Sequence, residues 1–308
     1  MEDSFWLSLM IGNSRLHWAL LQRDNVVEVW DTGHMGREGP SGKADGKGPG
    51  GSTAEEEGIP LSFISVKAQE MLRGEATGKM AKGIGAPDYL HIDWQKFRVA
   101  SVVPKELELW VRRCPGISPI SSRDAIDGVG EYATLGVDRA LAVRGAARVR
   151  GWPVMVVDCG SALTFTAGDE QGRLGGGAIL PGVRLQLAAL GTRTAQLPSD
   201  VVLPEELPPR QELRRYVQWA MSTPGAIQAG VMWTIVAGIQ AFIKDRWKID
   251  PDATVVFTGG DGRALHKAVL DSWEDKKVDV ERLRDRIQYV GEVIHWGLAD
   301  LTLEAVEP

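Results

Sequence analysis

The sequence has few of the residues that stabilise small secreted or metal-bound folds. Only two of its 308 residues are cysteines, Cys114 and Cys159, and two cysteines provide neither a disulfide framework nor the ligand set of a structural zinc site. The opening residues Met1 to Ser4 lack the basic region of a signal peptide, and no apolar run approaches the roughly 20 residues that cross a bilayer. We therefore expect a cytoplasmic protein without a membrane segment.

The chain also lacks an excess of basic residues. Its net charge is −6 and its pI is near 5.5, so it has no general attraction for polyanions, and neither nucleic acid nor an anionic membrane is expected as a partner. With 44% hydrophobic and 25% charged residues, the composition is that of a folded globular protein. The length predicts two domains, an N-terminal lobe over 1–150 and a C-terminal lobe over 151–308.

Two stretches within the first lobe differ in composition from the rest. Residues 33–58 are rich in Gly, Ser, Lys and Glu and contain almost nothing apolar. Such a segment cannot bury enough surface to offset its ordering entropy, so we predict a disordered insertion there. A second Gly- and Lys-containing stretch, residues 73–87, is predicted to be loop.

Regular secondary structure is predicted on both sides of these stretches. The chain opens with two apolar runs joined by Gly12, Asn13 and Ser14, a combination typical of antiparallel strands. Thr223 is expected to cap the longest helix, because Pro224 suits the first helical position. The predicted strands are 5–11, 16–21, 26–30, 97–103, 153–157, 160–167 and 254–257, and the predicted helices are 140–149, 224–247 and 292–303.

One arrangement occurs twice along the chain. An apolar strand, a turn containing Gly12 to Ser14 and a return strand open the sequence, and the same plan recurs after Pro153 around Asp158 to Ser161. This is a coarse internal repeat with one copy in each lobe. Two such lobes facing each other would place both turns at a shared cleft, where ligands often bind.

Both turns have residues suited to binding phosphate. A glycine lets the backbone approach an anion closely, and a following Asn or Ser offers hydrogen-bond donors. Gly12 to Arg15 could hold one end of a triphosphate, while Gly160 and Ser161 hold the other. A plain hairpin remains the commoner interpretation of such a turn taken alone.

Three further positions carry polar groups at the ends of predicted elements. Asp138 and Arg139 precede a helix, where Asp138 could accept a hydroxyl proton and Arg139 could bind a carboxylate, although a helix cap explains Asp138 equally well. Asp158 ends an apolar strand, a costly place for a charge without a partner such as a cation. Residues 258–261 follow a buried strand and suit contact with a ribose, although a plain turn between strand and helix is the default.

The order of these segments resembles the type III pantothenate kinases, which include the Bvg accessory factor proteins and belong to the actin, hexokinase and Hsp70 superfamily. Eight segments carry the resemblance, and together they cover most of the chain outside residues 33–88. They are Ile11-Gly12-Asn13-Ser14, residues 101–104, 135–139, 158–164, 176–182, 194–198, 222–230 and Thr258-Gly259-Gly260.

The resemblance implies an α/β fold of two ribonuclease-H-like lobes, the actin-like ATPase fold, with a central cleft. It implies transfer of the γ-phosphoryl group of ATP to the 4′-hydroxyl of pantothenate, the first step of coenzyme A synthesis. Mg²⁺ and a monovalent cation, K⁺ or NH₄⁺, are the implied cofactors beside ATP. Family members are typically homodimers with the pantothenate site near the subunit interface.

The resemblance also implies roles for individual residues. Asp138 would be the catalytic proton acceptor, and Asp158 would bind the monovalent cation. The pantothenate site would contain Tyr132, Gly136, Val137, Asp138, Arg139 and Thr223. The ATP site would contain Met10, Ile11, Gly12, Asn13, Ser14, Arg15, Leu16, His17, Ser161, Thr258, Gly259 and Gly260.

The chain departs from the family pattern in three places. The family has an aspartate, which helps to hold the nucleotide's Mg²⁺, where this chain has Met10, and methionine is a poor ligand for a cation that prefers oxygen. The family spacer between Tyr132 and Gly136 is longer and contains proline. The family also tends to carry an aspartate where Thr166 stands.

Three alternatives follow from the same residues. The first is a kinase-fold protein that binds nucleotide without turnover and acts as a regulator, which Met10 favours. The second is another enzyme of the superfamily, such as a sugar kinase, an acetate kinase or a polyphosphatase. The third is a structural scaffold, which leaves the clustered glycines unexplained.

Overall fold

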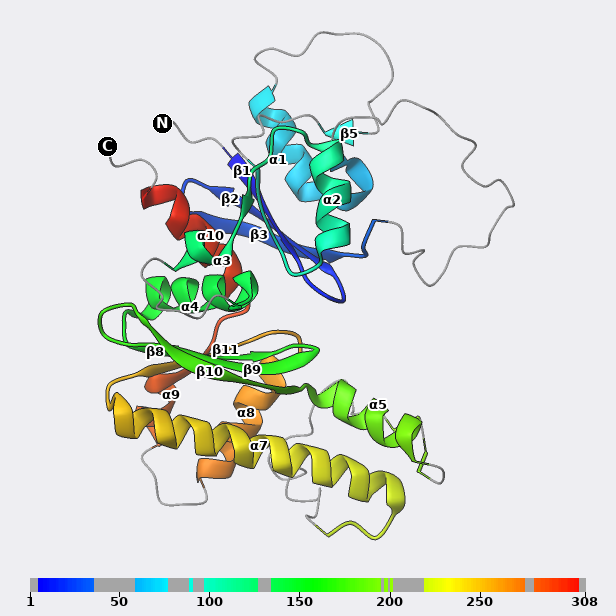
Figure 1. The fold of residues 1–308 in the computed structure, drawn as a ribbon, viewed down its shortest axis with the longest axis vertical. Helices are drawn as coiled ribbons and strands as arrows, with labels where there is room; N and C mark the ends of the chain where they lie inside the picture. The colour runs from blue at the N-terminus through cyan, green and yellow to red at the C-terminus, as the bar shows by residue number, and fades with distance from the viewer. Residues whose placement is uncertain are drawn as a thin grey trace. The chain divides into compact units, whose positions relative to one another are not determined.

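The computed structural model contains two compact units, each with its own sheet (Figure 1). Unit 1 comprises Met1–Ala125, Ala133–Leu141 and Ile294–Pro308, and unit 2 comprises Ile126–Tyr132 and Ala142–Val293. The residues that the structure describes are 5–35, 59–76, 89–90, 97–126, 134–194, 197–198, 200–201, 219–274 and 280–304.

Unit 1 is built on a five-stranded mixed sheet with the order β3-β2-β1-β6-β7. Its strands are β1 (Phe5–Ile11), β2 (Leu16–Gln22), β3 (Asn25–Thr32), β6 (Phe97–Ser101) and β7 (Pro119–Ile120). β1 pairs antiparallel with β2 and parallel with β6. β1 therefore lies at the centre of the sheet, between β2 and β6. Its residues are apolar and buried at nearly every position, as is typical of a strand covered on both faces.

Aromatic side chains fill the core of unit 1. The indole of Trp18 stacks with Trp30 at 6.1 Å and with Phe97 at 5.9 Å between ring centroids. Trp110 of α2 (Pro104–Arg113) meets Trp18 edge-on at 5.3 Å. Offset and edge-to-face contacts are the favoured geometries of aromatic pairs, so this cluster fixes α2 against the sheet.

Two helices, α4 (Val137–Arg150) and α10 (Val293–Glu304), contribute to unit 1 from later in the chain, and its other elements are shorter. α10 packs closely against α4, because a Cβ added at Gly297 would lie 2.2 Å from the carbonyl oxygen of Leu141. The short elements are β4 (Ile59–Pro60), paired with β5 (Tyr89–Leu90), a 3-10 helix η1 (Leu61–Phe63), α1 (Val66–Ala76) and α3 (Ser122–Ala125).

Unit 2 is built on a second five-stranded sheet with the order β10-β9-β8-β11-β12. Its strands are β8 (Val154–Cys159), β9 (Ala162–Gly168), β10 (Leu174–Pro181), β11 (Thr254–Thr258) and β12 (Ile287–Tyr289). β8 pairs antiparallel with β9 and parallel with β11. The first strand of unit 2 therefore lies at the centre of its sheet, as β1 does in unit 1.

The two sheets share one topology. In chain order the strands of each sheet lie as third, second, first, fourth and fifth, with antiparallel pairing among the first three and parallel pairing beyond. This confirms the internal repeat that the sequence predicts, and it confirms the predicted α/β class of two ribonuclease-H-like sheets.

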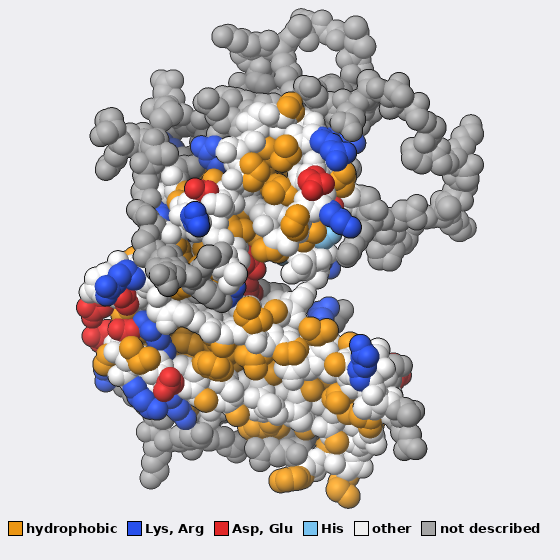
Figure 2. All heavy atoms as spheres, viewed as in Figure 1, with side chains coloured by type: hydrophobic (Ala, Val, Ile, Leu, Met, Phe, Trp, Pro, Cys, Tyr) orange, Lys and Arg blue, Asp and Glu red, His pale blue; other side chains and the backbone are white. Residues whose placement is uncertain are grey.

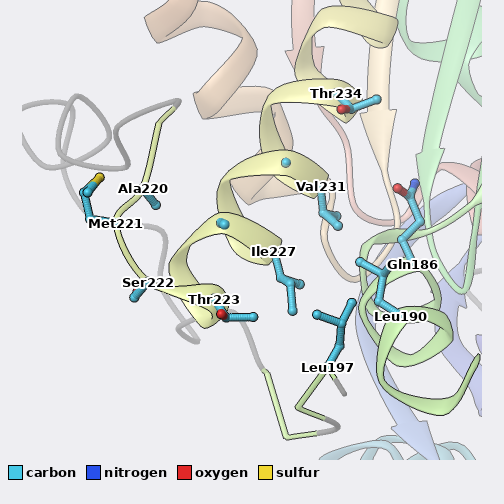
Figure 3. A pocket seen from close by; sticks show the side chains of 12 residues that line it. Gln186, Leu190, Leu197, Ala220, Met221, Ser222, Thr223, Ile227, Val231 and Thr234 are labelled. Atoms are coloured by element: carbon cyan, nitrogen blue, oxygen red, sulfur yellow. The ribbon is translucent and has the colours of Figure 1, made fainter. Parts of the chain in front are cut away.

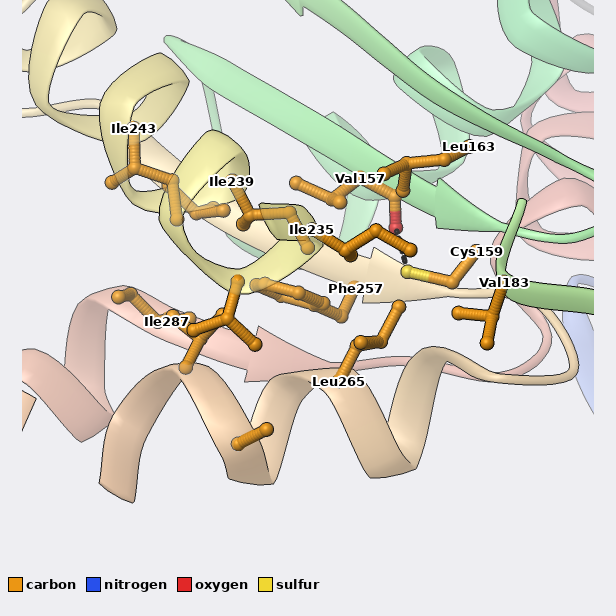
Figure 4. Packing of buried hydrophobic residues seen from close by; sticks show 14 of the residues in the cluster. Val157, Cys159, Leu163, Val183, Ile235, Ile239, Ile243, Phe257, Leu265 and Ile287 are labelled. Atoms are coloured by element: carbon orange, nitrogen blue, oxygen red, sulfur yellow. Dashed lines mark hydrogen bonds between the residues drawn. The ribbon is translucent and has the colours of Figure 1, made fainter. Parts of the chain in front are cut away.

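Helices cover the sheet of unit 2 and complete its core (Figure 4). Ile235, Ile239 and Ile243 of α7 project toward Val157 and Phe257 of the sheet. The helices of this unit are α5 (Val183–Arg193), α7 (Thr223–Ile249), α8 (Gly262–Glu274) and α9 (Val280–Arg286).

The helix α7 corrects one sequence expectation. Among the described residues it is the one helix that is long and apolar enough to cross a membrane by length and composition, although no such run was expected. Half of its most apolar window is buried inside unit 2. Burial of Ile239 and Ile243 in the core is what a core helix of a soluble protein requires.

Two other predictions about local structure were wrong. The N-cap of α7 is Ser222 rather than Thr223, because the hydroxyl of Ser222 accepts the backbone N–H of Gly225 at 3.3 Å. The predicted loop 73–87 begins inside a helix, since α1 continues to Ala76.

The predicted strands and helices agree with observed elements, with ends that shift by a few residues. Of the predicted insertion 33–58, residues 33–35 are described and residues 36–58 lie outside the described residues. The two compact units also divide the chain differently from lobes 1–150 and 151–308, because α10 groups with unit 1 and α4 contributes to both units.

The aromatic core of unit 1 generates a stability prediction. Phe97→Ala removes a fully buried ring that stacks on Trp18, and we expect it to lower the free energy of unfolding by about 3–5 kcal/mol. Denaturant titration followed by tryptophan fluorescence measures the change. The control Val66→Ala removes part of a side chain that is 74% exposed and should leave the midpoint unchanged. Equal midpoints for the two variants would contradict the packing described for this core.

Candidate active site

The turn between β1 and β2 in unit 1 is closed by backbone and side-chain hydrogen bonds. The N–H of Gly12 donates to the carbonyl of Arg15 at 3.0 Å. The carbonyl of Gly12 in turn accepts Nε2 of His34 at 2.8 Å, and His34 is buried. Asn13, Ser14 and Arg15 are exposed at the turn. The structure therefore holds the turn in place while its polar residues face solvent, as a phosphate-binding turn requires.

The apolar residues that flank this turn lie inside the sheet. Met10, Ile11 and Leu16 are each at most 2% exposed. Of the residues predicted for the ATP site, these three can contact a ligand only through the backbone. A buried thioether at position 10 does not fit Mg²⁺, which takes hard oxygen ligands.

His17 follows the turn and is held by a carboxylate that the sequence analysis did not single out. Nδ1 of His17 donates to Oδ1 of Asp31 at 2.7 Å. This hydrogen bond holds the pKa of Asp31 below its usual value, and burial opposes the shift. Asp31 stands 14 positions from His17 in the chain, and only the pairing of β2 with β3 brings them together.

A second histidine lies under the same sheet. His295 of α10 shares a hydrogen bond with the hydroxyl of Ser8 at 2.6 Å. Burial lowers the pKa of His295 to about 3; His17 adds a smaller lowering effect, and Asp31 raises the pKa slightly. His295 is therefore neutral near pH 7 and ties the C-terminal helix to β1.

The predicted catalytic residue lies in the first turn of α4, also in unit 1. Asp138 is the second residue of this helix, so it is not the capping residue that precedes the helix. Its Oδ1 accepts the N–H of Arg139 at 2.8 Å. A Cβ added at Gly136 would lie 2.4 Å from this oxygen, so the carboxylate folds back over Gly136 and a side chain there would have to displace it. Asp138 is half-buried and therefore open to a ligand on one side.

The other residues predicted for the pantothenate site differ in accessibility. Val137 and Arg139 are buried, while Gly136 is half-buried. Tyr132 lies outside the described residues.

A second group of predicted residues meets at the carboxyl ends of β8 and β11 in unit 2. Asp158 and Thr258 are Cα partners in the parallel pair. Gly259 follows with a φ of 84°, and a Cβ there would lie 2.4 Å from Oδ1 of Asp158. The N–H of Asp261 donates to the carbonyl of Cys159 at 2.9 Å. These contacts bring the segments 158–161 and 258–261 side by side.

The carboxylates of this edge concentrate negative charge. Burial raises the pKa of Cys159 well above its usual value, and the charges of Asp158 and Asp261 raise it further. Burial also raises the pKa of Asp261, against a smaller opposing effect of Arg184, whose Nε lies 3.8 Å from Oδ1 of Asp261. The Cys159 thiol is therefore unreactive. The carboxylates of Asp158 and Asp261 give these strand ends a negative charge that suits a cation.

Ser161 is held at the same edge by a close backbone approach. Its carbonyl accepts the N–H of Gly182 at 2.9 Å. A Cβ at Gly182 would lie 2.2 Å from the carbonyl oxygen of Gly160. A side chain at position 182 would therefore displace the turn that carries Ser161, which gives Gly182 a role that the sequence pattern alone did not reveal.

Thr223 lies apart from this edge, in a pocket between α5 and α7 (Figure 3). The pocket has a volume of about 720 Å³, within the usual range for small-molecule sites. Thr223, Ile227 and Val231 on α7 face Gln186 and Leu190 on α5. The lining is mostly apolar, with a few hydroxyl and amide groups.

The predicted site residues thus fall into separate groups, some in unit 1 and some in unit 2. Unit 1 carries the turn 12–17 and the Asp138 segment, and unit 2 carries the Asp158 edge and Thr223. Asp31 and Arg184 were missed because nothing in their local sequence marks them. Among the described residues, no three His, Cys, Asp or Glu side chains are close enough together to hold a metal ion.

Comparisons with known proteins agree on one family. The family model described as type III pantothenate kinase matches residues 69–245. The chain is 37% identical to the type III pantothenate kinase of Nostoc sp. PCC 7120 over 297 residues, covering 96% of this chain and 94% of that protein. It is 34% identical to the protein of the same name from Synechocystis sp. PCC 6803, covering 89% of this chain and 87% of that one.

Among solved structures, the chain is similar to a Campylobacter jejuni protein described as a Baf family transcriptional activator. The TM-score is 0.51, with 16% sequence identity over 97% of this chain and 98% of that one. At this identity the likeness supports the fold.

The close approach at Gly259 generates a prediction with an internal control. Gly259→Ala places a Cβ against Asp158 at a positive φ, whereas a Cβ at Gly260 meets nothing within 4 Å. We expect Gly259→Ala to lower the melting temperature by several degrees, because strain of about 1–3 kcal/mol is added, and Gly260→Ala to leave it unchanged. Differential scanning calorimetry measures both, and similar melting temperatures would argue against the contact with Asp158.

Proposed function

The chain belongs to the type III pantothenate kinase family, and we propose that it transfers the γ-phosphoryl group of ATP to the 4′-hydroxyl of pantothenate with Asp138 as the proton acceptor. The observation that carries the proposal is the 37% identity to a type III pantothenate kinase over 96% of the chain. The product is 4′-phosphopantothenate, so the reaction is the first step of coenzyme A biosynthesis.

Two features of Asp138 support its proposed role as a general base. Its carboxylate is half-buried in the first turn of α4, and one oxygen is held by the N–H of Arg139. The hydroxyl proton of pantothenate passes to this carboxylate as the oxygen attacks the γ-phosphorus, and ADP leaves. Gly136, Val137 and Arg139 line the pantothenate site around Asp138.

The glycine turns of both units bind the nucleotide. In unit 1, Gly12 to Arg15 present backbone and side-chain donors to phosphate oxygens. In unit 2, Ser161 contacts ATP, and the segment Thr258 to Gly260 lies against the ribose or the phosphates. Phosphoryl transfer depends on positioning and charge neutralisation more than on covalent catalysis, so backbone-rich turns are suited to it.

Mg²⁺ and the monovalent cation are assigned to different binding groups. Since Met10 does not fit Mg²⁺, we assign the Mg²⁺ of the nucleotide to phosphate oxygens and water rather than to this position. Asp158 fits a monovalent cation, K⁺ or NH₄⁺, because it is a half-buried carboxylate beside the charge of Asp261. Such a cation would supply positive charge to offset that of the phosphates.

The pocket at Thr223 and the surface around it support two further parts of the proposal. Thr223 contributes a hydroxyl to pantothenate binding from the pocket between α5 and α7. Exposed hydrophobic side chains lie on α7 and just before it, namely Trp219, Met221, Trp233, Phe242 and Ile249, and Figure 2 shows hydrophobic side chains at the surface of this unit. An apolar surface of this kind favours a homodimer. The proposed location is the cytoplasm.

The role of Asp138 is tested by an assay of ADP release with ATP, Mg²⁺, K⁺ and pantothenate. Asp138→Asn should lower the pantothenate-dependent rate by roughly 10²–10⁴-fold, the usual contribution of a general base. The matched control is Asp245→Asn on the exposed face of α7, where the carboxylate contacts only Lys248 at 3.4 Å among described residues. Full activity of Asp138→Asn would refute its role, and no release by the wild-type protein would refute the function.

The role of Asp158 is tested by titrating K⁺ in the same assay at fixed ATP. Asp158→Asn removes a charged ligand, so we expect the K⁺ concentration for half-maximal activity to rise about tenfold or more. A parallel titration with Na⁺ and with the Asp245→Asn control separates this effect from ionic strength. An unchanged K⁺ response would exclude Asp158 as the cation ligand.

A further inference from the structure

The C-terminal helix α10 contacts two parts of unit 1 that the proposed reaction uses. His295, in the first turn of α10, shares a hydrogen bond with the hydroxyl of Ser8 on β1 at 2.6 Å. Two residues further on, Gly297 meets the backbone of α4 at Leu141. β1 leads into the turn Gly12 to Arg15, and α4 carries the proposed general base in its first turn. α10 therefore joins the strand before the turn to the helix of the base.

The contact at Gly297 is made with backbone atoms of α4. A Cβ added at Gly297 would lie 2.2 Å from the carbonyl oxygen of Leu141, 2.9 Å from its carbonyl carbon and 3.1 Å from its Cα. Gly297 and Leu141 are both buried. Since the nearest atoms belong to the backbone, no side-chain rotation can make room. A methyl group at position 297 would therefore push the two helices apart by roughly 1 Å in this close-packed interior.

The other side of α10 is fixed to the sheet of unit 1. Ser8 and His295 are both buried, so separating them would leave two buried polar groups without partners, which is costly. Ser8 lies on β1, the central strand of its sheet. Because α10 is held on this side, the displacement caused by a side chain at Gly297 falls on α4.

Asp138 lies midway between two fixed points of the backbone. On its C-terminal side, Leu141 packs against Gly297. On its N-terminal side, the carbonyl of Leu135 accepts the hydroxyl of Ser122 at 2.5 Å. A shift of α4 at Leu141 is therefore passed to Asp138 within one turn of the helix, and it moves the carboxylate relative to the rest of unit 1.

We propose that Gly297 is a positioning residue for the phosphoryl transfer, because its missing side chain sets the distance between α10 and α4 and so places the carboxylate of Asp138 for proton transfer. The inference rests on the proposed function, since it takes Asp138 as the base. Gly297 is buried and touches no substrate, so it acts only through α4. A side chain there slows the transfer step and leaves nucleotide binding unchanged.

Steady-state kinetics of Gly297→Ala give the first test. A displacement of about 1 Å at a reacting group can cost about 10²-fold in rate, so we expect kcat to fall roughly 10–100-fold while the KM for ATP stays within about twofold. The matched control is Gly238→Ala on α7, a helical glycine where a Cβ meets nothing within 4 Å, and it should keep both constants. A folded Gly297→Ala protein with unchanged kcat would overturn the proposal.

A double-mutant cycle separates positioning from a general packing defect. Transfer of radiolabelled phosphate from ATP to pantothenate measures the slow rates of Asp138→Asn and of the double variant. In the Asp138→Asn background, Gly297→Ala should lower the rate by less than about twofold, because the carboxylate that it positions is already gone. A defect that acts elsewhere would lower the rate by the same factor in both backgrounds, and that result would overturn the proposal.

A second variant covers the case in which Gly297→Ala fails to fold. Ser8→Ala removes the hydroxyl that holds His295 and adds no atom beside α4. We expect it to lower kcat several-fold in the native background and to have little effect in Asp138→Asn, whereas equal effects in both would overturn the proposal. If the wild-type protein transfers phosphate and Asp138→Asn does not, such equal effects refute only the inference. A wild-type protein without pantothenate-dependent transfer refutes the function as well.

Discussion

Asp158 and Thr258 are neighbours at the ends of two parallel strands, and a glycine with positive φ follows the second strand. This close approach is possible because position 259 has no Cβ, which would otherwise lie 2.4 Å from the Asp158 carboxylate. The adjacent backbone bond from Asp261 to Cys159 then joins the two turns. The cation site and the nucleotide contacts proposed for unit 2 all depend on this one junction, because it fixes the carboxylates and the glycine backbone together.

Unit 1 repeats the topology of unit 2 but differs in the chemistry at the equivalent place. Its first strand ends in buried Met10 and Ile11 rather than in a carboxylate, and the charged groups come instead from the neighbouring strands as His17 and Asp31. One topology can thus present an acidic edge in one copy and a histidine-carboxylate pair in the other. The sheet supplies the positions, whereas the side chains decide the charge and therefore the ligand.

The fold and much of the candidate site could be predicted from the sequence. The apolar runs and the glycine turns placed β1, β2, β8, β9 and β11, and the ordered motifs supplied the candidate residues Asp138, Asp158 and the Thr258 turn. The cap of α7 was misplaced by one residue because Ser222 and Thr223 are both good capping residues. Helix α1 was not predicted, and its last residues were assigned to a loop, because Gly74 and its polar neighbours do not resemble a helix interior.

The sequence alone determined the family, the α/β class and the repeat, because these depend on the order of local patterns that any copy of the chain carries. Only the tertiary structure decided which distant residues act together. Asp31 reaches His17 through strand pairing, Gly182 reaches Gly160 through a close backbone contact, and Ser8 reaches His295 across 287 positions. Such contacts leave no local signal, because each is set by strand register and helix packing rather than by the residues beside it.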